Sequence, residues 1–226
     1  MSSQEYALVF YGIMLLSIIS IRLPRIGRYV RVANTMIHEC GHAFMALLLN
    51  GKVISVELFD DTSGTAKTSS GKVAGFFIAL SGYVFSSMMA YLLFFLLHYQ
   101  LIDIILWIFG GLALINLLFF VRNRFGMFWL LCFTALHAAA IYYPFQQFKW
   151  LTASIFSMVV LSDSVMSTLV LLYISMSDRK KAGDAWILRQ KTSIPTILWA
   201  LLFVAISGLI AFAIVNRFFP SHETIF

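Results

Sequence analysis

Charged residues are scarce in this chain of 226 residues, because only 12% are Asp, Glu, Lys or Arg while 61% are hydrophobic. A typical soluble domain has about a quarter charged residues, and less than half of its residues are apolar. The scarcity of charge therefore excludes an ordinary soluble globule and indicates an integral membrane protein. At roughly 30 residues for each span with its loop, a chain of this length has room for about six spans.

Cysteines are also few. Cys40 and Cys132 both lie inside apolar runs, so nothing indicates the disulfide framework of a secreted protein. The net charge of +6 comes mostly from basic residues in short loops, a distribution that orients membrane proteins and does not indicate binding to nucleic acid. No linker or repeat interrupts the chain, and we expect a single domain, residues 1–226, in the lipid bilayer.

Long apolar runs predict the helices of this protein. They lie at about residues 6–21, 32–49, 73–97, 101–121, 125–142, 151–176 and 194–215. Residues 53–59 alternate between the two faces of an extended chain and are followed by a polar turn at residues 60–64, which predicts a short β-hairpin. The expected fold class is an all-α polytopic membrane protein of about six to seven membrane helices, with this hairpin after the second run.

Three loops are basic, at residues 22–31, 122–124 and 179–191. The positive-inside rule places all three on the cytoplasmic side of the membrane. Three apolar runs separate the first of these loops from the second, so the two loops could not share a side if all three runs crossed. We expect the most polar of these runs, residues 32–49, to enter the membrane without crossing it fully and to return through the hairpin.

The second run contains His38-Glu39-Cys40-Gly41-His42, an H-E-x-x-H sequence. On a helix, His38 and His42 lie one turn apart on one face, where both imidazoles can bind a single Zn²⁺. Glu39 lies beside them and can act as the general base toward a metal-bound water. Each ionisable group in hydrocarbon costs at least ~2.5–3.5 kcal/mol by insertion scales. A metal would offset that cost, and interhelical hydrogen bonds are the alternative.

A catalytic zinc needs a third protein ligand and an open position for water. Asp163 is the favoured candidate, because it is the only carboxylate well inside a late apolar run. Asp184 is the alternative, although it follows a basic stretch at a membrane boundary and reaches the metal only if its loop folds back. His137 and Asn116 each lie alone in an apolar run and could line a polar cavity or form interhelical hydrogen bonds.

Several short motifs together resemble a known family. They are the H-E-x-x-H sequence with residues 48–53 after it, Ser81-Gly82-Tyr83, residues 122–126, Gly183-Asp184-Ala185 and Ile194-Pro195. This set is similar to the bacterial site-2 protease type of membrane metallopeptidase, and within it to the peptidase M50B-like branch. The resemblance covers residues 22–215.

The resemblance implies a polytopic zinc metallopeptidase that hydrolyses peptide bonds of membrane-protein substrates, in the cytoplasmic membrane of a bacterium. It implies that His38 and His42 bind Zn²⁺ and that Glu39 is the catalytic acid and base. The third ligand of the family is the aspartate of a Leu-Asp-Gly sequence. The nearest match in this chain is Leu161-Ser162-Asp163-Ser164, which has a serine before the aspartate and no glycine after it.

Two other classes of function stay open at this point. A catalytically inactive membrane scaffold, or a metal-binding membrane protein, predicts a closed site with four ligands, whereas a peptidase predicts three ligands and access for water. A transporter predicts more acids within the membrane than Asp163 alone. For a peptidase, the expected strand at residues 53–59 could hold an extended substrate by strand addition.

Overall fold

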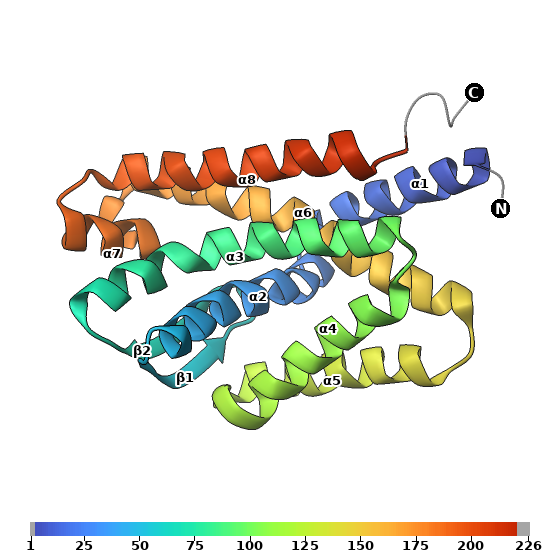
Figure 1. Cartoon of the computed structure of the whole chain (residues 1–226), viewed down its shortest axis with the longest axis horizontal. Helices are drawn as coiled ribbons and strands as arrows, with labels where there is room; N and C mark the ends of the chain where they lie inside the picture. The colour runs from blue at the N-terminus through green and yellow to red at the C-terminus, as the bar shows by residue number, and fades with distance from the viewer. Residues whose placement is uncertain (1–2, 221–226) are drawn as a thin grey trace.

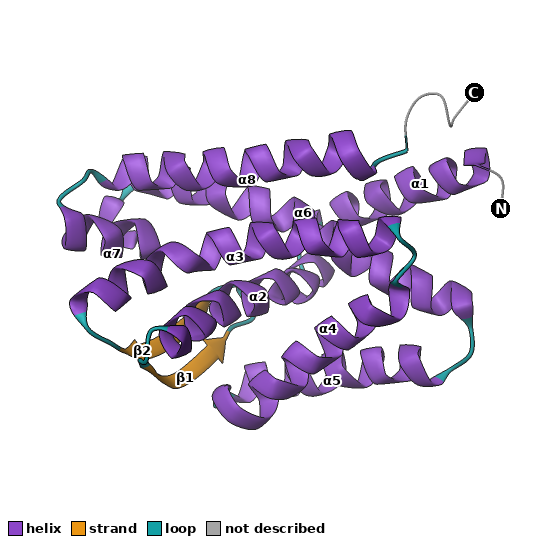
Figure 2. Cartoon of the chain, in the orientation of Figure 1, coloured by secondary structure: helices purple, strands orange, loops and turns teal. Residues whose placement is uncertain are grey.

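The computed structural model describes residues 3–220. The chain is mostly helical, with one antiparallel pair of strands (Figures 1 and 2). In chain order the elements are α1 (Ser3–Arg22), α2 (Ile26–Leu48), β1 (Lys52–Leu58), β2 (Gly64–Ser69), α3 (Lys72–His98), α4 (Ile102–Ile115), the π-helical turn η1 (Asn116–Phe120), α5 (Arg124–Tyr142), α6 (Gln146–Ser177), the 3-10 turn η2 (Arg179–Lys181), α7 (Gly183–Thr192) and α8 (Thr196–Phe218).

Five helices of the described chain are long and apolar enough to cross a membrane: α3, α4 continued by η1, α5, α6 and α8. The bent pair of α1 and α2, whose axes meet at 102°, passes the same test as one broken span and would be the sixth. The expected fold class is therefore confirmed, with five to six candidate membrane helices and a two-stranded hairpin after α2.

Both ends of the described chain lie at one end of the molecule, and the hairpin and α7 lie at the other (Figure 1). The hydroxyl of Tyr11 donates a hydrogen bond of 2.8 Å to the carbonyl of Pro220. The ring of Phe10 packs edge-on against that of Phe219, with centroids 4.9 Å apart. These contacts join α1 to the segment after α8, far from the hairpin.

Helix α2 lies along the hairpin. Near its middle, the hydroxyl of Thr35 donates a 2.8 Å hydrogen bond to the carbonyl of Thr62 in the hairpin turn. Just past its end, Gly51 lies so close to β2 that a Cβ there would be 3.0 Å from the carbonyl oxygen of Ser69. Because α2 contacts the hairpin from Thr35 to just past its C-terminal end, this part of the helix lies beside the hairpin and does not run to the other end of the molecule (Figure 1). This agrees with the expectation that residues 32–49 form no separate crossing.

The outer edge of β1 is covered by the chain between η1 and α5. Val56 pairs in parallel with Val121. The side-chain amide of Asn123 bonds the backbone of Leu58 twice, since its Oδ1 accepts from the Leu58 N–H and its Nδ2 donates to the Leu58 carbonyl. The hairpin is therefore fixed on one side by the bundle, and β2 is the strand with an open edge.

Candidate metal centre

Helix α2 carries the H-E-x-x-H sequence where it packs against α3 and the hairpin. The i and i+4 spacing brings the Nε2 atoms of His38 and His42 to 3.1 Å from each other. His42 and Glu39 are buried, with 7% and 4% of their surface exposed. Gly41 allows this packing, because a Cβ at that position would lie 2.7 Å from the Cβ of Phe85 in α3.

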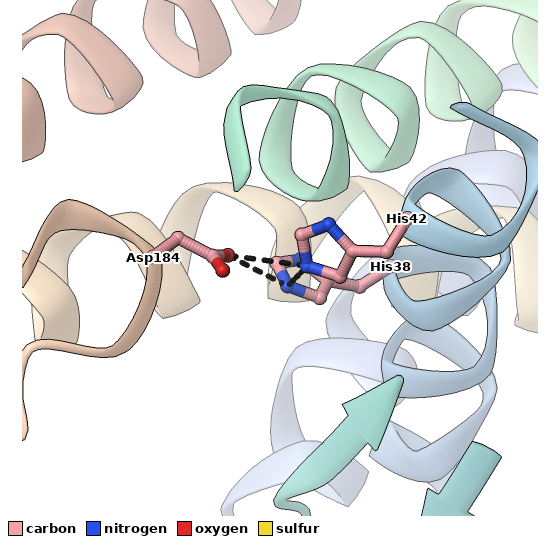
Figure 3. Close-up of side chains that lie close together, drawn as sticks. All are labelled: His38, His42 and Asp184. Carbon is pink, nitrogen blue, oxygen red and sulfur yellow. Dashed lines mark hydrogen bonds and ion pairs between the residues drawn. The ribbon is translucent and has the colours of Figure 1, made fainter. Parts of the chain in front are cut away.

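The third member of the group is Asp184, in the first turn of α7. Its Oδ2 lies 3.2 Å from Nε2 of His38 and 3.3 Å from Nε2 of His42 (Figure 3). Burial raises the pKa of the Asp184 carboxyl, but the adjacent His42 and His38 imidazoles more than offset it and hold that pKa below its usual range. Asp184 is therefore a carboxylate at neutral pH, the form that binds a metal.

These three atoms fit a divalent metal ion. Ligands at a tetrahedral zinc with bonds of ~2.0–2.1 Å lie ~3.3–3.4 Å apart, and the three distances in this group are 3.1, 3.2 and 3.3 Å. The other ring nitrogen of His42, Nδ1, lies 2.6 Å from the carbonyl oxygen of Ile78. An N–H at Nδ1 donates to that oxygen and leaves Nε2 with a lone pair for the metal, which is the usual outer support of a histidine ligand.

Two glycines make space for the group and for the acid beside it. A Cβ on Gly82 of α3 would lie 2.6 Å from Nε2 of both His38 and His42, where the metal would be held. A Cβ on Gly64 of β2 would lie 2.6 Å from Oε1 of Glu39. Only a residue without a side chain fits at either position.

Asp163 does not take the position expected of it, since its carboxylate is bonded to other groups. Oδ1 accepts a hydrogen bond of 2.5 Å from Nε of Arg31, and Oδ2 accepts one of 3.0 Å from the amide of Asn34. We expected Asp163 to be the third ligand because it lies deep within an apolar run. The structure folds the polar stretch after α6 back against the bundle, so Asp184 lies half-buried beside the histidines, while Arg31, on α2, reaches Asp163.

Two other polar residues singled out in the sequence lie elsewhere. His137 donates through an N–H at Nδ1 to the carbonyl of Phe133 and is packed among aromatic rings. Asn116 donates to the carbonyl of Leu112, one turn before it, and to the sulfur of Cys40. Neither side chain lines the cavity next to the histidines.

A cavity of about 790 Å³ opens beside the group. Its wall includes His38, His42, Glu39 and Asp184, the length of β2, and parts of α3, α6 and α7. Sequence analysis did not single out Arg31, Asn34 or Tyr83 as lining residues. The sequence around Arg31 did not predict a place in the cavity, because Arg31 belongs to a basic stretch that we interpreted as setting the orientation of the protein in the membrane.

The family model described as Peptidase M50B-like matches residues 10–214. This chain belongs to the Peptidase M50B-like family. A search of the curated proteins and a search of the solved structures each gave no match to it.

Membership of this family agrees with the resemblance found in the sequence and covers every element that forms the site. As a member of a membrane peptidase family, the M50B-like chain has proteins as its class of substrate and a bilayer as its surroundings. Its group of two histidines and one aspartate is consistent with the metal site of a metallopeptidase.

Proposed function

We propose that this chain is a zinc-dependent intramembrane peptidase that hydrolyses peptide bonds of membrane-protein substrates. In this proposal His38, His42 and Asp184 hold Zn²⁺, and Glu39 is the catalytic acid and base. The observation that carries it is the meeting of three ligand atoms, within 3.3 Å of one another, on the wall of an open cavity beside a buried glutamate.

The number of ligands separates this proposal from its rival. A membrane scaffold or storage protein would hold a structural zinc in a closed set of four protein ligands. The metal-ligand group among residues 3–220 has three members. Three ligands leave one position for water or substrate, which supports catalysis.

In the proposed reaction the bound metal would supply Lewis acidity, which activates a water molecule and polarises the peptide carbonyl. Glu39 takes a proton from the attacking water and passes it to the nitrogen of the leaving amine. Its position suits this role, because the Oε1 side of its carboxyl lies against Gly64 of β2 on the cavity wall. The hairpin therefore orients the acid while the cavity stays open to substrate.

The open edge of β2 is the natural place for the substrate backbone. Val56 and Leu58 direct their backbone groups away from β2, toward residues 121–123. Their cross-strand partners, Ala66 and Gly64, therefore direct theirs to the outer edge of β2, which lines the cavity. A substrate must unwind from a helix to expose its carbonyls, and strand addition at this edge would hold it extended beside Glu39. We therefore propose that substrate pairs with β2, whereas the sequence favoured the strand at residues 53–59.

The direct test compares three purified proteins, the wild type, Glu39→Gln and Glu57→Gln, on labelled single-span helices in detergent. Glu57 is a matched control, since it pairs with Lys67 on the hairpin surface. We expect all three proteins to hold about one zinc, and cleavage to be lost only in Glu39→Gln, because an amide cannot accept the proton of water. Cleavage by Glu39→Gln at the wild-type rate would show that another group is the base.

A further inference from the structure

Tyr83 of α3 lies directly against the candidate metal centre. Its ring packs edge-on against the imidazole of His38, with centroids 4.5 Å apart. On another side the ring contacts Phe203 of α8, with centroids 4.8 Å apart. Tyr83 follows Gly82, whose missing side chain lets α3 approach the histidines. The phenol ring is thus held in place by contacts from α2 and α8.

The hydroxyl of Tyr83 is available to a ligand. It makes no hydrogen bond to any residue between 3 and 220, it is not among the fully buried polar atoms left without a partner, and Tyr83 lines the cavity. A tyrosine whose ring is packed usually finds a partner for its hydroxyl. Tyr83 shares the cavity wall with Asp184, Glu39 and Asp163.

Several other donors on the cavity wall are bonded to neighbouring groups or lie far along their helix from Asp184. Arg31 and Asn34 both donate to Asp163. The hydroxyl of Thr35 donates to the hairpin turn. Lys191 packs over Gly75 and stands seven residues along α7 from Asp184, which is ~10 Å of helix. Among these side chains Tyr83 is the one whose ring packs against a candidate ligand, so it is placed to donate a hydrogen bond beside the metal position.

Peptide hydrolysis creates a need for such a donor. When water adds to the carbonyl carbon, negative charge develops on the carbonyl oxygen, and a donor already aimed at that oxygen stabilises the transition state more than the ground state. We propose that the hydroxyl of Tyr83 donates a hydrogen bond to the carbonyl oxygen of the scissile peptide as this charge develops, which makes Tyr83 a catalytic residue. This inference rests on the proposed peptidase function.

The proton balance of the reaction is complete without ionisation of Tyr83. A carbon–oxygen bond forms between water and the carbonyl carbon, and the carbon–nitrogen bond breaks. Glu39 carries the proton of the water to the amine nitrogen. Tyr83 keeps its own proton and only shares it in the hydrogen bond.

The variant Tyr83→Phe tests this role, because it removes the hydroxyl and keeps the ring contacts with His38 and Phe203. The control is Tyr91→Phe, on the same helix, whose ring packs against Phe218. We expect Tyr83→Phe to lower kcat by ~10²–10³-fold, the usual loss for one such donor. KM should change by less than about threefold and zinc content should stay at the wild-type value, while Tyr91→Phe should behave as wild type.

Binding measurements give a readout that does not depend on turnover. A phosphinic peptide, which is tetrahedral and anionic at the scissile position, should bind zinc-loaded Tyr83→Phe at least ~10-fold more weakly than wild type. The uncleaved substrate should bind equally well to Glu39→Gln and to Glu39→Gln/Tyr83→Phe.

Three results would overturn the inference: a wild-type kcat in Tyr83→Phe, a loss of zinc, or an equal loss of affinity for substrate and phosphinic peptide. The last two would mean that Tyr83 only packs against the ligands. If the wild-type protein cleaves nothing, the proposed function fails, and the phosphinic-peptide comparison still decides whether the hydroxyl binds a tetrahedral anion.

Discussion

The spacing of the two histidine ligand atoms depends on residues that bind nothing themselves. Ile78 offers a carbonyl to Nδ1 of His42, and Gly82 leaves open the space in front of both Nε2 atoms. Both residues belong to α3, so the geometry of the group depends on how closely α3 packs against α2. The candidate metal centre therefore depends on helix packing as well as on the motif.

Gly82 gives a prediction at this scale. We expect Gly82→Ala to lose most of its zinc, because the new Cβ would lie 2.6 Å from the ligand nitrogens of His38 and His42. Gly208→Ala, in α8, is the control, since a Cβ there meets nothing within 4 Å. Metal analysis of both purified variants checks this, and full zinc content in Gly82→Ala would show that the ligands do not lie where the structure has them.

The spacing of residues within one helix predicted part of this site but could not predict the rest. His38, Glu39 and His42 are separated by a single helical turn, so a helix alone brings them together. Asp184 joins them only because the chain folds back after α6, which local spacing does not indicate. We favoured Asp163 because it lies deep within an apolar run. Its partner Arg31 belongs to a basic stretch that we had attributed to the orientation of the protein in the membrane.

At the scale of elements, the hairpin is held on one edge and open on the other. The side-chain amide of Asn123 makes the two hydrogen bonds to Leu58 that a neighbouring strand would otherwise make. The outer edge of β2 lines the cavity. The alternation of residues 53–59 predicted the hairpin correctly. It could not indicate which strand would face the site, because that depends on the contact with residues 121–123, far along the chain.

Removing the amide of Asn123 should loosen the hairpin. Asn123→Ala loses two hydrogen bonds to Leu58, each worth about 1 kcal/mol. We expect the backbone amides of β1 to exchange their hydrogens ~10–30-fold faster, with zinc content unchanged. Gln100→Ala is the control, because its amide bonds the carbonyl of Leu97 at the opposite end of the molecule. It should leave the hydrogen exchange of β1 unchanged. Unchanged exchange in Asn123→Ala would mean that other contacts hold the strand.

At the scale of the whole molecule, positive charge gathers at the end with the hairpin and α7. Of the 16 Lys and Arg residues, all but Lys149 and Arg217 lie in or beside the loops, strands and short helices of that end. The positive-inside rule assigns that end to the cytoplasmic side. We therefore expect the three basic loops to share one side of the membrane, as they do if α2 makes no separate crossing.

Labelling with a membrane-impermeant maleimide tests this orientation in intact cells. We expect Gln147→Cys, at the start of α6, to be labelled from outside, and Lys180→Cys, after α6, to be labelled only once the membrane is opened. Both positions are exposed, whereas Cys40 is buried and Cys132 lies within a membrane helix, so the unmodified chain is the control. The reverse pattern would invert the orientation.

The central claim is that the fold of the whole chain brings Asp184, and not Asp163, to the histidines as the third ligand. The most direct measurement is zinc affinity, determined by chelator competition, for the wild type, Asp184→Ala and Asp163→Ala. We predict that Asp184→Ala lowers the affinity by more than ~100-fold, since even an outer-shell partner costs 10–100-fold. Asp163→Ala should keep zinc within a few-fold of wild type. Wild-type affinity in Asp184→Ala, with loss of zinc in Asp163→Ala, would contradict the account.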